Sequence, residues 1–523
     1  MEYGVFSANE FLFTDSYLGM AAKEVKIDAA RDSYAAFQVA CKPRSSLAIL
    51  FEPGSDLPCP EIFMVLPVDV MRNTDVGYNG QNYLVKDGDF VPYATRKAPF
   101  TVFDALLPID YATDLGNQDL KVFYFRFCTN GLASGNYKCK LNLMDGEEET
   151  IIPVEINLHK VAVPKKETLR ITNWFHPEKI AEYLDVPMWS EAFWEYLYEY
   201  GVMMRSARQT DFFINHTFFK DHSFVDGKYV FDFTNTKKLI EMYFALGFTY
   251  IEGPIMLYRK NWHYSEFYIK IGDEDVDALS EKGIAFVKDF YSAWYAFLKE
   301  NDWDKCLYQH VGDEPGEHCL ENYSRLSNII RECMPDIPII EALANASFSD
   351  AVDIMVPKSV DYLREKEEFD KIKKERPMWY YTCCEPGGEY LNRVLDQELL
   401  RGRLLHWANF IYGFSGYLHW GLNYYIHDNP FHLAEGEFAG DGPLPAGDTH
   451  IIYYKDGMLL GSLRMEMMRF GAEDYELLKL LEKDNPINAK IIAEKIIRSF
   501  DDYTKNVNCF ERVYNQLLHF LEA

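Results

Sequence analysis

Two adjacent carboxylates, Asp313 and Glu314, lie in the segment HVGDEPGEH (residues 310–318). A short apolar run and Gly312 precede them and Pro315 follows, so we expect them where a strand ends and a loop begins. A strand that bends into a loop can direct both side chains into one site, where two carboxylates in different environments can act as acid and as ionised group. The same residues are equally typical of an exposed acidic turn before a helix N-terminus.

The histidines around this pair suggest a metal site, but their spacing argues against one. His310 and His318 have Pro315 between them, whereas the zinc motif HExxH needs two histidines one helical turn apart. The acidic run DEDVD (residues 273–277) resembles the start of a calcium loop, but it lacks the glycine at the sixth position and has Ile284 in place of the bidentate glutamate. The sequence therefore predicts no metal ligands and no cofactor.

Two further segments place aromatic residues beside hydrogen-bonding side chains at expected strand ends. These are MWYYTCCEPGGEYLNR (378–393) and GYLHWGLNYY (416–425). Aromatic rings can stack on the apolar face of a sugar, and Asn, His or Tyr groups can bind its hydroxyls. In a chain with 16% aromatic residues, any single ring is more typical of the core. Because the acidic pair and both aromatic segments stand at strand ends, the pattern favours a carbohydrate site.

The elements that must position these residues change in character near residue 165. Residues 1–165 carry period-two apolar runs such as AAFQVA and KVFYFRF, which predict a β-sandwich. Across residues 166–470, roughly eight short apolar strands alternate with amphipathic helices, which predicts a (β/α)8 TIM-like barrel with catalytic residues at the strand ends. Residues 471–523 predict a helical C-terminal extension packed on the barrel. The predicted fold is thus multidomain, β and α/β.

Individual helix boundaries can also be predicted. SEAFWEYLYEYG predicts a helix that is capped by Ser190 and ends before Gly201. NTKKLIEMYFALG predicts another helix with a closing glycine. LLGSLRMEMMRFGAEDYELLKLLEK and NAKIIAEKIIRSFDDY each predict an amphipathic helix near the C-terminus.

Composition limits the classes of partner. The chain has 523 residues and a formal net charge of −28, which repels nucleic acid and anionic membranes. No apolar run is long enough to span a membrane, and no secretion signal is visible, so we expect a cytoplasmic protein. The ten cysteines form no CxxC pair and no tight framework, which is consistent with reduced thiols. Nothing in the sequence predicts the oligomeric state.

The motifs, taken in order, resemble glycoside hydrolase family 123. The resemblance rests on HVGDEP, WYYTCCEPGGEYLNR, RGRLLHWANFIYGFSGYLHWGLNYY, GDTHIIYY and GSLRMEMMRFGAEDYELL, which lie within residues 308–478. It implies an exo-acting, retaining hydrolase of terminal β-linked N-acetylhexosamine, with N-acetylgalactosamine favoured. In such substrate-assisted catalysis the 2-acetamido oxygen attacks the anomeric carbon and forms an oxazolinium ion, so no protein nucleophile is needed.

The resemblance also implies roles for the two carboxylates. Glu314 is the expected general acid, which protonates the leaving oxygen and later activates water. Asp313 is expected to hold the acetamido N–H and to stabilise the developing positive charge.

Further substrate-binding residues are implied by position in the motifs. Tyr381 or Tyr380 is expected to donate to the acetamido oxygen, Trp420 to form a wall of the −1 subsite, and Asn423 and His419 to lie near hydroxyls. Two alternatives stay open: a glycosidase for a sugar without an acetamido group, and a non-catalytic carbohydrate-binding protein. The acidic pair argues against the latter, because a binding protein needs no proton donor.

Overall fold

The computed structural model forms two compact units. Unit 1 comprises Met1–Thr168, Gly387–Tyr412 and Tyr425–Ala523, and unit 2 comprises Leu169–Pro386 and Gly413–Tyr424. The residues that the structure describes are 1–54, 57–77, 83–86, 91, 93–110, 120–432, 436–437 and 443–522.

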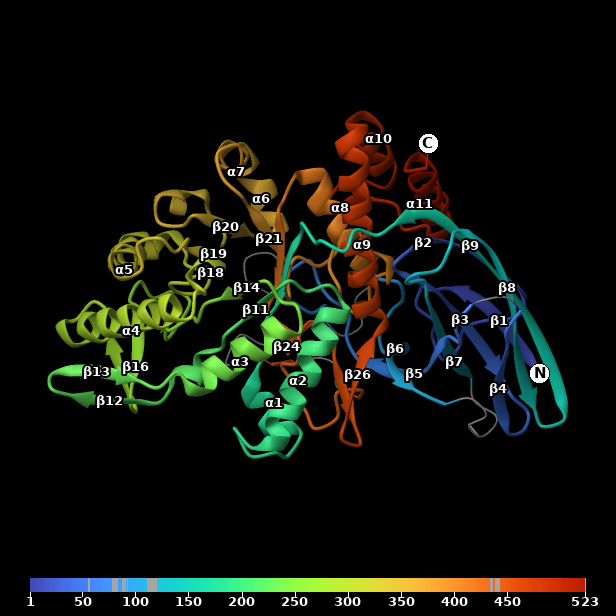
Figure 1. The fold of residues 1–523 in the computed structure, drawn as a ribbon, viewed down its shortest axis with the longest axis horizontal. Helices are drawn as coiled ribbons and strands as arrows, with labels where there is room; N and C mark the ends of the chain where they lie inside the picture. The colour runs from blue at the N-terminus through green and yellow to red at the C-terminus, as the bar shows by residue number, and fades with distance from the viewer. Residues whose placement is uncertain are drawn as a thin grey trace. The chain divides into compact units, whose positions relative to one another are not determined.

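Unit 1 contains two facing β-sheets (Figure 1). Their strand orders are β2-β9-β8-β4 and β1-β3-β7-β5-β6-β26-β25. Alternate apolar residues such as Val39, Phe125 and Ile156 are buried in the core shared by the two sheets, so the β character predicted for residues 1–165 is confirmed. The strands of this region are β1 (Glu2–Ser7), β2 (Val25–Arg31), β3 (Tyr34–Lys42), β4 (Leu47–Glu52), β5 (Glu61–Val70), β6 (Phe100–Pro108), β7 (Lys121–Cys128), β8 (Gly135–Asp145) and β9 (Glu148–Ala162).

Later parts of the chain complete unit 1. Strand β26 pairs antiparallel with β6, and helix α9 packs its Met467 and Phe470 into a second core with Val102 and Leu106 of β6. Helix α11 contacts β2 and β9. These elements are α8 (Leu400–Tyr412), β23 (Gly436–Glu437), β24 (Pro443–Leu444), β25 (Tyr453–Lys455), β26 (Met458–Ser462), α9 (Leu463–Asp484), α10 (Pro486–Ile496), β27 (Ile497–Ser499), β28 (Asp502–Tyr503) and α11 (Val507–Phe520).

The compact units and the expected domains agree on a boundary near residue 168 and differ after it. Residues 387–412 and 425–523 group with the N-terminal strands, because β26 extends their sheet and α9 covers it. Two predicted helix extents were wrong. The first residues of LLGSLRMEMM form β26, so the helix begins only at Leu463, and residues 497–503 form the β27–β28 hairpin.

Unit 2 alternates strands with helices, and the ladders among its eight central strands are parallel. Strand β22 pairs with β10 and β21, β14 pairs with β11 and β18, and β19 pairs with β20. Isolated parallel bridges join Gln309 to Ile339 and Met355 to Met378. The strands are β10 (Arg170–Asn173), β11 (Asp211–Phe213), β14 (Tyr250–Glu252), β18 (Leu307–Tyr308), β19 (Ile340–Leu343), β20 (Ile354–Pro357), β21 (Trp379–Tyr381) and β22 (Gly416–His419).

Helices α4 to α7 lie outside the strands β14 to β21 in Figure 1. Residues 274–277 of the acidic run DEDVD form strand β17 of a hairpin. The helices of unit 2 are α1 (Pro177–Tyr183), α2 (Glu191–Ser206), α3 (Thr234–Ala245), α4 (Glu281–Glu300), α5 (Leu320–Cys333), α6 (Ser359–Arg364) and α7 (Lys366–Lys373). Its short additional strands are β12 (His222–Val225), β13 (Lys228–Phe231), β15 (Leu257–Tyr258), β16 (Tyr268–Ile271) and β17 (Glu274–Asp277).

Helix α2 begins as predicted but ends later. The Ser190 hydroxyl caps it by accepting a hydrogen bond from the amide of Phe193. The helix continues through Gly201, where a Cβ atom would come within 2.8 Å of the Tyr243 ring, so this glycine permits close helix packing instead of ending the helix. Gly247, with φ +96°, does follow α3 as a left-handed terminating residue.

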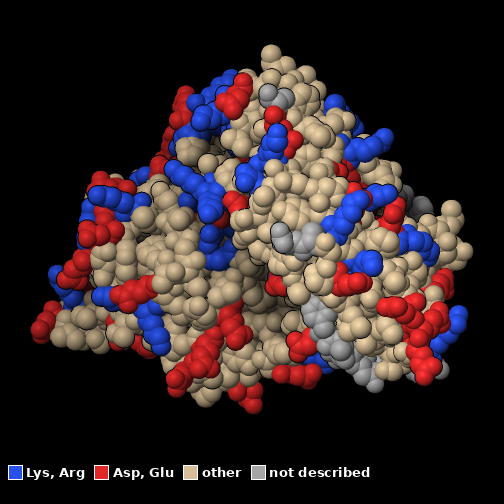
Figure 2. Space-filling view, turned by 45° about the vertical axis from the view of Figure 1, so that its right-hand side comes forward, with Lys and Arg blue, Asp and Glu red and all other residues tan. Residues whose placement is uncertain are grey.

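Charged side chains of both signs are interspersed over the face shown in Figure 2, with large uncharged areas between them. The net charge of −28 therefore does not gather into one acidic surface on this face. Among the described residues, no helix combines the length and the apolar character needed to cross a membrane.

Candidate active site

The acidic pair, Asp313 and Glu314, follows β18 in the segment that leads toward α5. Both side chains are half-buried, so they are accessible to a ligand and partly shielded from water. Glu314 has φ +44°, in the left-handed region that non-glycine residues seldom adopt. Such a conformation costs free energy and persists only where the surroundings hold it in place, which is common at functional sites.

Hydrogen bonds from other elements fix the backbone of the pair and of the two residues before it. Arg259, which follows β15, donates from Nη2 to the carbonyl oxygens of Asp313 (3.1 Å) and Glu314 (2.7 Å). Glu341 of β19 accepts from the amides of Val311 and Gly312, both at 3.0 Å. Two charged side chains therefore hold the peptide segment that carries the carboxylates.

His310 lies between two buried glutamates. Its Nδ1 is 2.8 Å from Glu341 and its Nε2 is 2.8 Å from Glu252 of β14. Glu252 also accepts from the indole N–H of Trp174 at 2.9 Å. Burial lowers the pKa of His310, but the two glutamates outweigh it and raise this pKa to about 10. The imidazole is therefore a cation at neutral pH, and it links three neighbouring strand ends.

The carboxylate of Glu314 faces a phenol and an ammonium group. The hydroxyl of Tyr381 donates to Glu314 Oε1. Burial, followed by the charge of Glu314, raises the pKa of Tyr381 well above its usual value, so the phenol stays neutral and can donate. Lys358, which follows β20, pairs with Glu385. Burial lowers the pKa of Lys358, but Glu314 and Glu385 outweigh it and raise this pKa, so the lysine stays charged.

Asp313 occupies a different environment from its neighbour. Burial raises its pKa well above the ordinary value, and the negative charges of Glu314 and Glu341 raise it further. His310 and Arg259 act in the opposite direction without reversing the shift. Burial and the two neighbouring negative charges therefore favour the protonated form of the Asp313 carboxyl.

The two tyrosines of β21 point to opposite faces of the strand, as its alternation requires. Tyr381 belongs to an apolar cluster with Trp174, and Trp420 packs against the same cluster as a half-buried side chain. Tyr380 is fully buried, and its ring packs against Phe414 at 5.4 Å and against another tyrosine. The structure thus brings Tyr381 to the acidic pair, places Trp420 on the apolar cluster that holds Tyr381, and places Tyr380 on the other side of β21.

The remaining predicted residues lie at or just after the end of β22. Asn423 is fully buried, and its Oδ1 accepts from the amide of His176 at 2.8 Å. His419 is also fully buried, and its Nδ1 accepts from the Gly421 amide at 3.0 Å. The ring of Trp420 lies 6.1 Å from that of His176. Asn423 and His419 therefore support the loops of this end of unit 2.

Four residues that hold this arrangement were not predicted from the sequence: Glu252, Arg259, Glu341 and Lys358. A signal existed for the two glutamates, because each is a lone carboxylate in a short apolar strand, YIEG and PIIEAL, where burial demands a partner. No comparable signal marked Arg259 or Lys358. Each follows its strand in a segment whose path depends on tertiary packing.

Comparison with protein-family models matches residues 174–481 to "Glycoside hydrolase 123, catalytic domain", which is more than half of the chain. The chain belongs to glycoside hydrolase family 123. The resemblance inferred from the motifs is therefore confirmed, and the protein is a glycoside hydrolase. The acidic pair, Tyr381 and Trp420 all lie within the matched residues.

A solved structure from Clostridium perfringens is similar over nearly the whole chain. It is the structure of a family 123 glycoside hydrolase that is described as hydrolysing glycolipid glycans. The TM-score is 0.75 at 13% identity, with 99% of this chain and 97% of that chain covered, which establishes a shared fold. A β-galactosidase from the psychrophilic Marinomonas ef1 gives a TM-score of only 0.38 at 9% identity, with 63% of this chain and 62% of that chain covered. This score is too low to indicate a shared fold. No curated protein matches this chain.

Proposed function

We propose that this family 123 enzyme removes a terminal β-linked N-acetylhexosamine, with N-acetylgalactosamine favoured, by retaining, substrate-assisted hydrolysis. The observation that carries the proposal is the acidic pair itself. Asp313 and Glu314 are adjacent and half-buried, and each has different partners. Two adjacent carboxyl groups can each contact a different part of one sugar residue, namely the acetamido group and the glycosidic oxygen.

The neighbouring carboxylates support a mechanism without a protein nucleophile. Glu341 accepts two backbone amides, the Tyr323 hydroxyl and the His310 ring. Glu252 accepts from Trp174 and Thr172, and also contacts His310. Both glutamates are fully buried and committed to these contacts, so neither is placed to attack an anomeric carbon.

In the proposed mechanism Glu314 protonates the leaving oxygen and then activates water. Asp313 accepts the acetamido N–H and faces the charge that develops on the oxazolinium ring. Accepting that hydrogen bond favours the ionised form of Asp313. The hydroxyl of Tyr381, which donates to Glu314 in the free protein, would turn to the acetamido oxygen.

Substrate contacts follow from the same geometry. Trp420, half-buried against the cluster that holds Tyr381, would form an apolar wall for the sugar ring. His419 and Asn423, which are fully buried, would hold the loop that carries this wall instead of contacting the sugar hydroxyls. The Clostridium perfringens enzyme is described as acting on glycolipid glycans, and a glycan ending in β-linked N-acetylgalactosamine is the substrate we propose here.

We also propose that the eight central strands of unit 2 form a (β/α)8 barrel. The strand pairings described above are parallel, and the amide of Thr210 before β11 donates to Ile171 of β10 at 3.1 Å. In such a barrel the acidic pair, Lys358 and Tyr381 would share the carboxyl-end face.

Hydrolysis of nitrophenyl glycosides tests the proposed reaction. We expect turnover of β-N-acetylgalactosaminide above β-N-acetylglucosaminide, none of β-galactoside or β-glucoside, and a product that is first released as the β-anomer. Preference for a sugar without the acetamido group would favour a two-carboxylate glycosidase. Binding of the amide sugars without turnover would indicate a protein that retains only the binding function.

A further inference from the structure

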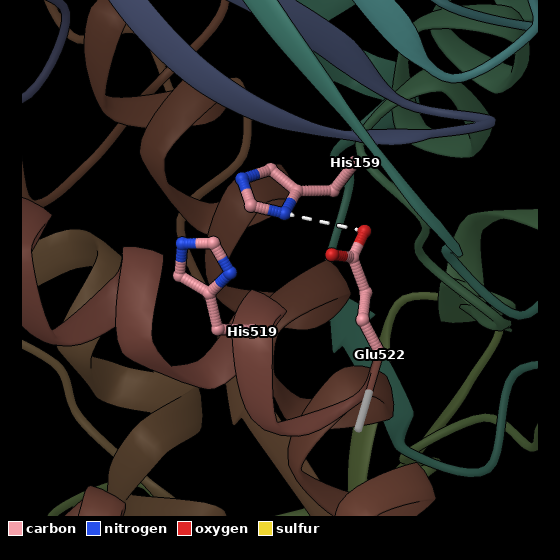
Figure 3. Close-up of side chains that lie close together, drawn as sticks. All are labelled: His159, His519 and Glu522. Carbon is pink, nitrogen blue, oxygen red and sulfur yellow. Dashed lines mark ion pairs between the residues drawn. The ribbon is translucent and has the colours of Figure 1, made fainter.

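His159, His519 and Glu522 of unit 1 form a cluster on the face of β9 that α11 covers. Ile156 and Leu158 of β9 are buried in the sandwich core, so the alternate residue His159 lies on the outer face. It is nevertheless buried, whereas His519 near the end of α11 is exposed and Glu522 is half-buried. Figure 3 shows both imidazole rings and the carboxylate turned toward a common space.

The donor atoms of this cluster have nearly the spacing of metal ligands. One donor atom from each residue lies within 4.8 Å of the others. His159 Nδ1 and Glu522 Oε1 are 3.3 Å apart. Two ligands bound to zinc at about 2.0–2.1 Å with a tetrahedral angle are separated by roughly 3.3–3.4 Å. The nitrogen of His159 and the oxygen of Glu522 are therefore already at the separation of two zinc ligands, and a donor atom of the exposed His519 lies within 4.8 Å of both.

A second observation concerns the other nitrogen of His159. Its Nε2 lies 3.0 Å from Asp28 Oδ1 on the neighbouring strand β2, where the carboxylate can accept its proton. Metal-bound histidines usually donate their second N–H to a carboxylate in this way, which directs the other nitrogen's lone pair at the ion. The amide of Lys160 donates to Glu522 Oε1 and holds the carboxylate opposite Nδ1.

We propose that His159, His519 and Glu522 bind a divalent transition-metal ion of the zinc type. Two imidazoles and one carboxylate suit Zn²⁺, Co²⁺ or Ni²⁺ and leave at least one position for water. The ion takes the place of the proton between His159 and Glu522. It thereby ties the last turn of α11 to β9, which is a structural role in unit 1 and independent of the proposed hydrolysis in unit 2.

Titration of the whole chain with Zn²⁺ tests the site. The protein should carry no histidine tag and should first be freed of bound metal with a chelator. Calorimetry then measures Zn²⁺ binding, and the absorption bands of bound Co²⁺ provide a second readout. We expect one ion per chain and a higher melting temperature with zinc. His519→Ala and Glu522→Gln should each weaken binding at least about tenfold, and Asp28→Asn about 10–100-fold.

His263→Ala removes an exposed histidine of unit 2 and serves as the matched control, which should bind zinc as wild type does. Because His519 is exposed, its alanine variant should keep the melting temperature of the metal-free chain. Absence of saturable binding in the wild type, or equal binding after His519→Ala and Glu522→Gln, would overturn the proposal. Chelation should leave glycoside hydrolysis unchanged, so the result is independent of the proposed reaction.

Discussion

Asp313 and Glu314 carry the same functional group, but their carboxyl groups have different surroundings. Glu314 accepts a hydrogen bond from the hydroxyl of Tyr381 and lies near Lys358, whereas Asp313 lies near His310, Glu341 and Arg259. Substitution of each by its amide should therefore have different kinetic consequences.

Glu314→Gln should slow substrates with poor leaving groups most, because a nitrophenolate departs with little protonation. The loss on a natural glycan should reach about 10²–10⁴-fold. Asp313→Asn should slow both kinds of substrate alike, since oxazolinium formation itself is impaired. Steady-state rates on nitrophenyl and alkyl N-acetylhexosaminides measure the difference. Wild-type turnover by Asp313→Asn would falsify the role assigned to Asp313.

The two tyrosines of β21 offer a matched pair of variants. Tyr381→Phe keeps the ring in its apolar cluster and removes the donor to Glu314, so kcat should fall about 10²–10³-fold. Tyr380→Phe makes the same chemical change on the other face of the strand, among Phe414 and Tyr417, and should leave kcat near wild type. Equal rates for both variants would exclude a catalytic role for the Tyr381 hydroxyl.

At the scale of elements, strands β14, β18 and β19 are linked through one buried charge. His310 bridges Glu252 and Glu341, and Glu341 binds the backbone before the acidic pair. The folded-state pKa of His310 is raised from about 6.5 to about 10. Its stabilising contribution is therefore complete below about pH 6.5 and is lost as the pH rises toward about 10.

The free energy of unfolding should accordingly fall by up to about 1.4 kcal/mol per pH unit in this interval. His310→Gln should lose that slope and be less stable at neutral pH, because two buried carboxylates lose their cation. Denaturant unfolding of both proteins between about pH 6 and 10 measures it. A wild-type slope as flat as that of the variant would mean that His310 is neutral in the folded protein.

Helix α9 shows that a family motif can serve the fold. In GSLRMEMMRFGAEDYELL, the buried Arg464 pairs with Asp104 of β6, and the buried Glu466 pairs with Arg126 of β7 at 2.6 Å. These charges fasten α9 to the outer face of the seven-stranded sheet. This motif therefore contributes to the packing of unit 1, whereas the acidic pair supplies the proposed chemistry.

At the scale of the whole molecule, the chain returns to unit 1 after building most of unit 2. The outer face of the seven-stranded sheet carries Val68, Val102 and Leu106, which are buried together with Leu463 and Met467 of the C-terminal part. A fragment ending at residue 168 would expose that face to water and leave the edge of β6 unpaired.

We therefore expect residues 1–168 alone to aggregate or to bind a hydrophobic dye strongly, unlike the full chain. Co-expression of a second chain, in which residues 387–412 are joined to residues 425–522, should restore solubility. This second chain supplies β26, which pairs with β6, and α9, which covers the exposed face of the sheet. Dye fluorescence and sedimentation of the fragment with and without that chain measure this. A soluble, cooperatively unfolding fragment 1–168 would show that the two facing sheets suffice.

The sequence by itself determined the β character of the first 165 residues, the start of α2 and the family. Period-two runs predicted the strands of residues 1–165, Ser190 predicted the start of α2, and HVGDEP placed the acidic pair after a strand. These features are local, because they depend on backbone preferences and on the alternation of side chains within a few residues.

The tertiary structure decided what the local pattern could not. Gly201 resembles a helix end in the sequence but permits packing against Tyr243, and the lone glutamates of β14 and β19 prove to be partners of His310. Arg259 reaches the carbonyls of the acidic pair from another hairpin. Burial, pKa and contact all depend on which distant segments meet, and that is set by the packing of the whole core.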